Sequence, residues 1–264
     1  MARGDLTLTA STKDGATIPR MDTHSCPEPA ASPLPDPAQR LSALQAVLFD
    51  LDGTLIDTVE LIRISFRYAT KTVLGEALPD EVTMANVGQP LATQFHDMAP
   101  QHASELLRVY RAFNGAHHDE LARAYAGTLE TLRELRRRGV PMGVVTSKGT
   151  ESAMRGIEHF GIAEFMETVV TADDVSRHKP DPYPLCVAAD RMGVALGYCI
   201  YVGDSPHDMQ AAISGNAIPV AALWGAFSAE AVMSPGPAFA LRSITELPAL
   251  LDGEAERFAA RGSA

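Results

Sequence analysis

The sequence predicts an α/β fold in which a parallel β-sheet is covered by helices and interrupted by an all-helical insertion. From Gln45 onward, short apolar runs typical of buried strands alternate with segments typical of amphipathic helices. The gap between the first two strand-like runs is about 90 residues, too long for one crossover, and it has helical periodicity from Val59 to Tyr125.

The expected sheet contains short runs of apolar residues, each bounded by polar or turn-forming residues. Strands are expected at residues 46–50, 142–146, 168–171, 199–203 and 218–222. Helices between and after them are expected at residues 128–138, 150–160, 183–192, 206–214 and 244–251. Gly139 and Gly215 stand where helix C-terminal caps are expected.

Three regions follow from this pattern. Residues 42–57 and 127–264 are expected to form the sheet-containing core, and residues 58–126 an inserted helical domain. Residues 1–41 hold six of the 18 prolines and have no hydrophobic period, so a disordered leader is expected there. This leader lacks the apolar core and cleavage site of a signal peptide, and Met21 is an alternative start.

The composition limits the classes of function. With 264 residues and 46% hydrophobic content, the chain can bury a full α/β core. A net charge of -11 argues against nucleic acid or an anionic membrane as the main partner. The three cysteines form no metal-like pair, and no apolar stretch approaches the length needed to span a bilayer. We expect a cytoplasmic protein, either a monomer or a homodimer.

The first strand-like run ends in two carboxylates within the sequence VLFDLDGT at residues 47–54. Ligands of open α/β sheets bind at the carboxyl ends of the strands, and a turn there could direct Asp50 and Asp52 toward one small volume. Two anions this close repel each other unless a cation lies between them, which favours a Mg2+ site. Taken alone, the pair is equally consistent with a turn whose acids cap the next helix.

Three more polar clusters, each after a separate apolar run, favour a catalytic site. They are TSK at residues 146–148, RHKPDP at 177–182 and GDSPHD at 203–208. With residues 47–54, these clusters resemble the four ordered motifs of the haloacid dehalogenase-like (HAD) hydrolase superfamily, subfamily I. The resemblance implies a Rossmann-like parallel sheet core, with the insertion forming a helical C1 cap over the catalytic carboxylates.

This resemblance assigns chemistry to the first motif. Asp50 stands at the position of the family nucleophile, which attacks phosphorus and forms an aspartyl-phosphate. Asp52 stands at the position of the general acid and base, which protonates the leaving oxygen and then activates water. Because the dehalogenase and phosphonatase branches lack Asp at the second position, Asp52 favours cleavage of phosphoesters or phosphoanhydrides. Thr54 is expected in a supporting role.

The second and third motifs imply a phosphate clamp. The Thr146 hydroxyl, the Ser147 backbone N–H and the Lys179 ammonium correspond to the groups that bind the phosphoryl group in the family. Many members have Asn where this chain has Ser147, so only that side-chain contact is in question. Lys148 is also cationic, but it is expected to be a solvated lysine at the start of a helix.

The fourth motif implies a Mg2+ site. Asp204 corresponds to the carboxylate that joins Asp50 and the Asp52 carbonyl around the ion, with water completing the coordination. Asp208, one helical turn later, is expected to hold a metal-bound water or Lys179; the alternative is an ordinary first-turn Asp favoured by the helix dipole.

Within the cap, sequence similarity points to two substrates. VGQPL at residues 87–91 resembles a cap loop of phosphoglycolate phosphatase-like enzymes. NGAHHD at residues 114–119, with ELI at 60–62, is more similar to the pyrophosphatase branch of the same subgroup. The adjacent histidines could also form a metal pair, but neighbours on a helix do not share a face, and a solvated turn is the commoner case. The candidate substrate-specificity residues are Gln89, Asn114, His117 and His118.

The motifs together predict a Mg2+-dependent phosphohydrolase that acts on a small phosphorylated metabolite. Phosphoglycolate is the leading substrate, and inorganic pyrophosphate is the nearest competitor. A phosphosugar mutase of the β-phosphoglucomutase type uses the same nucleophile and remains an alternative, which product phosphate release would exclude. A non-catalytic binding module is disfavoured because all the charged motif residues are present, and neither a P-loop nor a dinucleotide-binding motif occurs.

Overall fold

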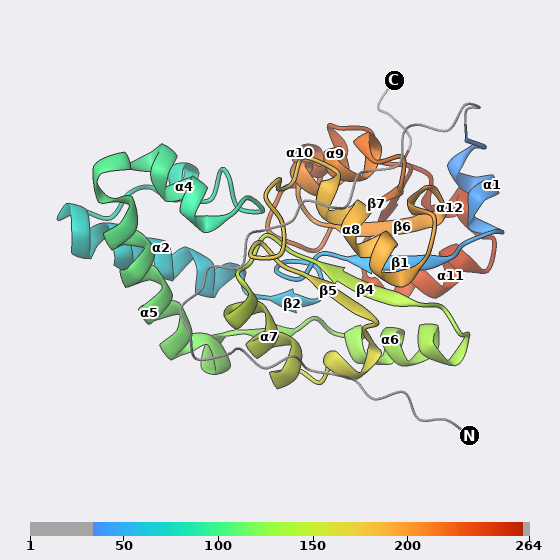
Figure 1. Cartoon of the computed structure of the whole chain (residues 1–264), viewed down its shortest axis with the longest axis horizontal. Helices are drawn as coiled ribbons and strands as arrows, with labels where there is room; N and C mark the ends of the chain where they lie inside the picture. The colour runs from blue at the N-terminus through green and yellow to red at the C-terminus, as the bar shows by residue number, and fades with distance from the viewer. Residues whose placement is uncertain (1–33, 261–264) are drawn as a thin grey trace.

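The computed structural model describes residues 34–260, and it has an α/β fold built on a six-stranded sheet (Figure 1). All six strands are parallel, in the order β5-β4-β1-β6-β7-β8. The strands are β1 (Ala46–Phe49), β4 (Met142–Val145), β5 (Thr168–Val170), β6 (Cys199–Gly203), β7 (Ile218–Ala222) and β8 (Phe239–Leu241). The Rossmann-like parallel core expected from the sequence is confirmed.

The five expected strands are all present, and β8 is an addition to them. β8 has three residues and is the edge strand beside β7, and its Phe239 also forms an antiparallel bridge with Ala259.

The helices that cover the sheet lie close to their expected positions. They are α6 (Thr128–Arg137), α7 (Thr150–His159), α8 (Tyr183–Met192), α9 (Pro206–Ser214) and α11 (Leu247–Leu251). Two short helices, α10 (Ala229–Met233) and α12 (Ala255–Phe258), are also present. The expected helix at 244–251 is divided into a 3-10 turn, Ile244–Glu246, and α11. The division occurs because Pro248 lacks the N–H that would bond the Ile244 carbonyl in a continuous α-helix.

Both faces of the sheet are buried. Along β1, Val47 and Phe49 pack into one hydrophobic cluster, while Ala46 and Leu48 pack into a second cluster. All four side chains are inaccessible to solvent. Successive side chains of a strand point to opposite faces, so this division means that helices cover the sheet on both sides.

The expectation of a disordered leader is wrong for its last residues. Residues Pro37–Leu41 form a helix, α1, with Asp36 as its N-cap. The buried Arg40 donates hydrogen bonds of 2.7 Å to the carbonyl oxygens of Gly197 and Asn216, and Leu41 packs into the hydrophobic core. The rest of the predicted leader, including the alternative start Met21, lies outside the described residues.

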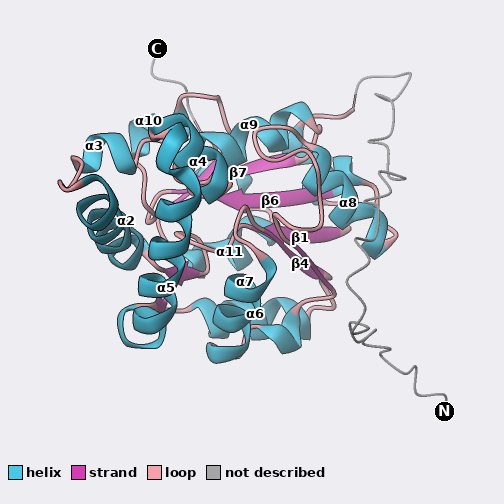
Figure 2. Cartoon of the chain, turned by 60° about the vertical axis from the view of Figure 1, so that its left-hand side comes forward, coloured by secondary structure: helices cyan, strands magenta, loops and turns pink. Residues whose placement is uncertain are grey.

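The insertion is all-helical and follows β2 (Ile56–Asp57), which pairs antiparallel with β3 (Arg123–Ala124) where the chain returns to the core. Its elements are α2 (Val59–Leu74), α3 (Asp80–Thr83), α4 (Leu91–Met98), the 3-10 turn Pro100–His102 and α5 (Ala103–Leu121). Figures 1 and 2 show these helices grouped beside the sheet-containing core.

The insertion has a hydrophobic cluster of its own. At its centre, the rings of Phe66, Phe95 and Tyr110 contact one another edge to face, with centroids 4.9 to 5.7 Å apart. Such aromatic contacts stabilise a small core beyond the area they bury. Within the described part of the chain, no helix is long and apolar enough to cross a lipid bilayer.

Candidate active site

Side chains from three adjacent strands meet at one edge of the sheet. Asp50 follows β1, Thr146 follows β4 and Asp204 follows β6. Since β1 lies between β4 and β6 and all three run parallel, their carboxyl ends lie at the same edge. All three side chains line one cavity, as the order of the motifs predicts.

Three buried carboxylates form the floor of this site. Asp50, Asp204 and Asp208 each offer an oxygen within 4.8 Å of the others, and their exposed fractions are 5%, 3% and 0%. Oxygen ligands at this spacing suit Mg2+. The sequence placed Asp50 and Asp204 together, and the structure adds the side chain of Asp208 to the cluster.

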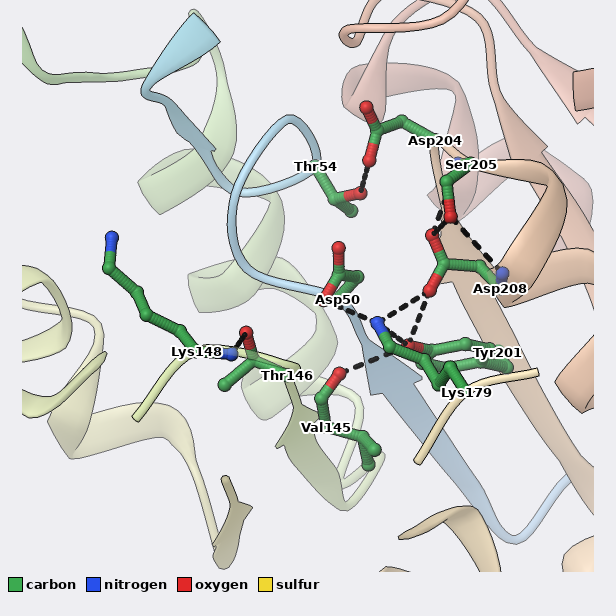
Figure 3. A network of polar contacts seen from close by, with 10 residues as sticks. All are labelled: Asp50, Thr54, Val145, Thr146, Lys148, Lys179, Tyr201, Asp204, Ser205 and Asp208. Carbon is green, nitrogen blue, oxygen red and sulfur yellow. Dashed lines mark hydrogen bonds and ion pairs between the residues drawn. The ribbon is translucent and has the colours of Figure 1, made fainter. Parts of the chain in front are cut away.

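Lys179 binds two of the three carboxylates (Figure 3). Its Nζ lies 2.8 Å from Asp50 Oδ1 and 2.6 Å from Asp208 Oδ1. The hydroxyl of Tyr201 lies 3.0 Å from the same Nζ and 3.0 Å from Asp208 Oδ1. Lys179 is therefore a buried cation shared by Asp50 and Asp208, whereas Asp204 lies on the side away from it (Figure 3).

Burial makes the charged forms of Asp50 and Asp204 unfavourable without a further cation. It raises the pKa of Asp50 to about 7, with Lys179 opposing the shift and Asp208 adding to it. Burial, followed by repulsion from Asp208 and Asp50, raises the pKa of Asp204 well above its usual range. Burial alone would lower the pKa of Lys179, but Asp208 and Asp50 together raise it. A divalent cation beside Asp50 and Asp204 would stabilise their charged forms and offset the repulsion between them, so the residues fit a Mg2+ site.

Asp208 has both an electrostatic and a structural partner. Its Oδ2 accepts hydrogen bonds from the backbone N–H and hydroxyl of Ser205, at 3.1 and 2.6 Å, and the Ser205 hydroxyl accepts from the Asp208 N–H. These contacts form a capping box at the start of α9. Asp208 thus holds Lys179, as one of the expectations proposed, and also fixes the helix that follows Asp204.

Asp52 points to a different part of the cavity from Asp50. Its Oδ1 accepts from the Thr58 hydroxyl and from Lys148 Nζ, both at 2.8 Å. The prediction that Lys148 is solvated is wrong, because only 13% of its side chain is exposed and it is paired with Asp52. The partners are 96 positions apart in the sequence, so no local pattern reveals the pair.

Asp204 is enclosed by backbone on two sides. A Cβ on Gly53, where φ is +84°, would lie 2.2 Å from Asp204 Oδ2, and a Cβ on Gly225 would lie 2.2 Å from Asp204 Cβ. The Ala226 N–H donates to Oδ2 over 2.7 Å, and the Thr54 hydroxyl donates to Oδ1 over 3.3 Å. Thr54 therefore has a supporting contact, whereas the Gly225–Ala226 loop had no recognisable motif in the sequence.

The phosphate-clamp residues of the second motif border the same cavity. Ser147 lines it beside Thr146, whose Oγ1 accepts the backbone N–H of Lys148 over 3.2 Å. The cavity has a volume of about 660 Å³ and is lined by residues of both the core and the insertion. It is large enough for a small phosphorylated molecule.

Three of the four cap residues proposed to contact substrate reach the cavity: Gln89, Asn114 and His118. The Gln89 amide nitrogen lies 3.3 Å from Nε2 of His207, a residue of the fourth motif, and joins the cap loop to the core. His117 is not brought to the cavity, because its Nδ1 contacts the Phe113 carbonyl and its ring stacks on the Phe113 ring.

Asn114 and His118 are themselves held by neighbours. The Asn114 amide donates to the Ser65 hydroxyl over 3.2 Å, and Nδ1 of His118 lies 2.9 Å from a carboxylate oxygen of Asp119. Burial lowers the pKa of His118, although its contact with Asp119 opposes the shift. A neutral His118 would donate from Nδ1 to Asp119 and leave Nε2 as an acceptor.

The sequence similarities of the chain agree with this geometry. The sequence model of the family described as "Haloacid dehalogenase-like hydrolase" matches residues 47–222, from the first motif to the end of β7. The chain belongs to this family. The pyrophosphatase PpaX of Bacillus velezensis is 36% identical over 202 residues, which cover 76% of this chain and 94% of the relative. The pyrophosphatase PpaX of Halalkalibacterium halodurans is 35% identical over 204 residues, covering 77% and 95%.

Solved structures share the fold. A predicted phosphatase from Clostridium acetobutylicum has 26% identity and a TM-score of 0.71, with coverage of 79% of this chain and 99% of that chain. A predicted phosphoglycolate phosphatase from Haemophilus somnus has 22% identity and a TM-score of 0.71, with coverage of 78% and 97%. This family membership, together with the geometry of the site, makes the protein a haloacid dehalogenase-like phosphatase.

Proposed function

We propose that the protein is a Mg2+-dependent phosphohydrolase that uses Asp50 as its nucleophile and prefers inorganic pyrophosphate. The convergence of Asp50, Lys179 and Asp204 beneath a cavity shared by core and cap carries this proposal. Carboxylates attack phosphorus effectively when cations neutralise the charge of the phosphoryl group.

Asp50 would attack the phosphorus atom, forming a bond between its carboxylate oxygen and phosphorus as the bond to the leaving oxygen breaks. Lys179 fixes the Asp50 carboxylate through Oδ1, and the buried Asp208 and Tyr201 fix Lys179 in turn. A nucleophile held in this way enters the reaction with little loss of conformational freedom.

Asp52 would donate a proton to the leaving oxygen and then take a proton from the water that hydrolyses the phosphorylated Asp50. Its carboxylate is held by Thr58 and Lys148, and both Asp52 and Asp50 line the same cavity. General acid–base catalysis of this kind typically contributes about 10²- to 10⁴-fold to the rate.

The phosphoryl group would be bound by Thr146, the Ser147 N–H and Lys179, at the carboxyl ends of the strands. Mg2+ would be held by Asp50, Asp204 and the Asp52 carbonyl, and it would neutralise charge on the phosphoryl oxygens. The carboxylate cluster fits this ion because its members are buried, and because burial raises the pKa of Asp50 and Asp204.

Inorganic pyrophosphate takes first place among the substrates because relatives at 35% and 36% identity are named pyrophosphatases and align over nearly their whole length. Phosphoglycolate, the leading substrate from sequence alone, becomes the second candidate. The loop at residues 87–91 supports it, since that loop lines the cavity and resembles the corresponding loop of phosphoglycolate phosphatase-like enzymes.

The proposal is tested by measuring phosphate release from pyrophosphate, phosphoglycolate, sugar phosphates and nucleotides, with and without Mg2+. We expect pyrophosphate to have the highest kcat/KM, and Asp50→Asn to abolish its hydrolysis. Asp97→Asn, an exposed acid on α4 outside the cavity, is the matched control and should behave as wild type. Near-normal turnover by Asp50→Asn would refute the nucleophile, and transfer between sugar positions without phosphate release would indicate a mutase.

A further inference from the structure

Two of the cations that line the cavity already have carboxylate partners. Arg155 donates to both carboxylate oxygens of Asp119, over 3.1 and 2.8 Å, and Lys148 is paired with Asp52. Arg111 differs from them: in the described part of the chain, no carboxylate oxygen lies within 4.0 Å of its guanidinium. A cation that faces a cavity without a partner is available to a ligand.

Arg111 extends from α5 of the insertion toward the core loop that carries Lys148. Its Nη2 lies 3.9 Å from the position that a Cβ on Gly149 would occupy. Oδ2 of Asp173 is 3.2 Å from the same position, but this oxygen accepts the N–H of Thr150 over 2.7 Å. Arg111 and Lys148 therefore border the same part of the cavity, one from the cap and one from the core.

This part of the cavity lies on the leaving-group side of the site. Lys179 binds Asp50, the proposed nucleophile, whereas Lys148 binds Asp52, the proposed donor of a proton to the leaving oxygen. Figure 3 shows the Lys148 side chain extending away from Asp50 and Lys179. The two lysines thus serve different ends of a bound substrate.

We propose that Arg111 and Lys148 form a second anion site, which holds the leaving phosphate of a diphosphate substrate. This inference rests on the proposed function. When substrate binds, Lys148 exchanges Asp52 for the leaving phosphate, and Asp52 is then released toward the oxygen that it protonates. A carboxylate, as in phosphoglycolate, offers the site a smaller negative charge and fewer acceptor oxygens.

The site favours the transition state over the bound substrate. As the bridging P–O bond breaks, negative charge accumulates on the leaving phosphate, directly beside the two cations. Interactions that strengthen as charge develops raise kcat as well as affinity. An aryl phosphate has no second anionic group, so it gains much less from Arg111 and Lys148.

Arg111→Gln tests the site against a matched control. Arg108→Gln changes an arginine one turn earlier on α5, with 72% of its side chain exposed and a position outside the cavity. For Arg111→Gln we expect kcat/KM for pyrophosphate to fall about 10- to 100-fold, the loss typical of a charge-assisted hydrogen bond. The ratio of pyrophosphate to aryl phosphate hydrolysis should fall at least about 10-fold. Arg108→Gln should leave both rates unchanged.

Two further measurements separate ligand binding from a structural role. Arg111→Lys should restore part of the pyrophosphate activity, and Lys148→Met should lower the same substrate ratio as Arg111→Gln. Calorimetry with methylenediphosphonate, which is not hydrolysed, should show weaker binding to Arg111→Gln and Lys148→Met but normal binding to Arg108→Gln. Thermal melting verifies that each variant is folded.

The outcomes distinguish this site from the proposed function. Equal losses on pyrophosphate and aryl phosphate, with unchanged diphosphonate binding, would overturn the second anion site while leaving the phosphohydrolase intact. If the variants lost activity selectively on phosphoglycolate, the site would bind the carboxylate of the glycolate leaving group, and the diphosphate assignment would be overturned. Absence of phosphate release from every substrate by the wild-type enzyme would refute the proposed function itself, whereas diphosphonate binding would still test the anion site.

Discussion

Gly53→Ala should disable the metal site without unfolding the protein. The Cβ of the new alanine would lie 2.2 Å from Asp204 Oδ2, 2.6 Å from its Cγ and 2.8 Å from its Oδ1. Ordinary contact at such a Cβ begins at 3.4 Å, so the Asp204 carboxylate must move by about 1 Å. Gly225 also lies against Asp204, which limits this movement, and the hydrogen bond from the Ala226 N–H would be lost or lengthened.

The substitution has two separable effects. Gly53 has φ of +84°, and placing alanine in this left-handed region costs roughly 1–2 kcal/mol of folding free energy. For a chain of this size, that loss lowers the melting temperature by roughly 2–8 °C. The displacement of Asp204 acts on catalysis instead, because a misplacement of about 1 Å can reduce turnover roughly 10²-fold.

Gly75→Ala provides the matched control for backbone strain. Gly75 ends α2 with φ of +87°, and a Cβ there would meet no atom within 4 Å. Gly75→Ala should lose only the thermal stability that the backbone strain costs, and Gly53→Ala should lose at least as much because it also displaces the buried Asp204. Only Gly53→Ala should lose about 10²-fold in kcat and require more Mg2+ for half-maximal activity. The assays are differential scanning fluorimetry and phosphate release against Mg2+ concentration. If Gly53→Ala kept activity within about two-fold of Gly75→Ala, the placement of Asp204 beside the metal would be wrong.

Other perturbations test separate parts of the molecule. Asp52→Asn should slow turnover by about 10²- to 10⁴-fold while phosphorylated enzyme still forms, which mass spectrometry after acid quench would detect; rapid multiple turnover would contradict the acid–base role. EDTA should abolish phosphate release and Mg2+ should restore it, whereas Ca2+ should substitute poorly because its coordination shell is larger and looser. Full activity in the presence of EDTA would exclude the metal requirement. Arg40→Ala removes two hydrogen bonds from a charged donor and should reduce stability by about 2 kcal/mol, lowering the melting temperature by roughly 4–8 °C. The exposed neighbour Gln39→Ala is its control, and equal melting temperatures for the two variants would show that α1 contributes no stability.

The central sheet could be predicted from sequence because its signals are local. Each of the five predicted strands is an apolar run, and polar residues follow immediately where β1, β4 and β6 end. The parallel arrangement then brings Asp50, Thr146 and Asp204 together without any knowledge of side-chain packing. The three-residue β8 also lies in an apolar stretch, residues 238–241, but it was not predicted.

Contacts between distant segments could not be predicted in the same way. Tyr201 lies inside an apolar strand, and the residues next to it in the sequence do not indicate that its hydroxyl contacts Lys179 and Asp208. Lys148 has the pattern of a solvated lysine at a helix start, yet the fold places it against Asp52. Such pairs depend on which strands lie side by side, and that information is spread over the whole chain.

The cap residues show how packing decides which side chains line the cavity. On α5, Arg111, Asn114 and His118 are separated by three and four positions, so they share one face, and all three line the cavity. His117 is equally polar, but it lies about 100° around the helix from His118. Polar residues occur on both of these faces of α5, so the sequence alone does not show which face lines the cavity. Packing of the apolar side, which includes the buried Leu106, fixes the rotation of α5 and turns Arg111 toward the cavity. If these residues bind the leaving group as we propose, its recognition depends on the hydrophobic core of the insertion as much as on the polar residues themselves.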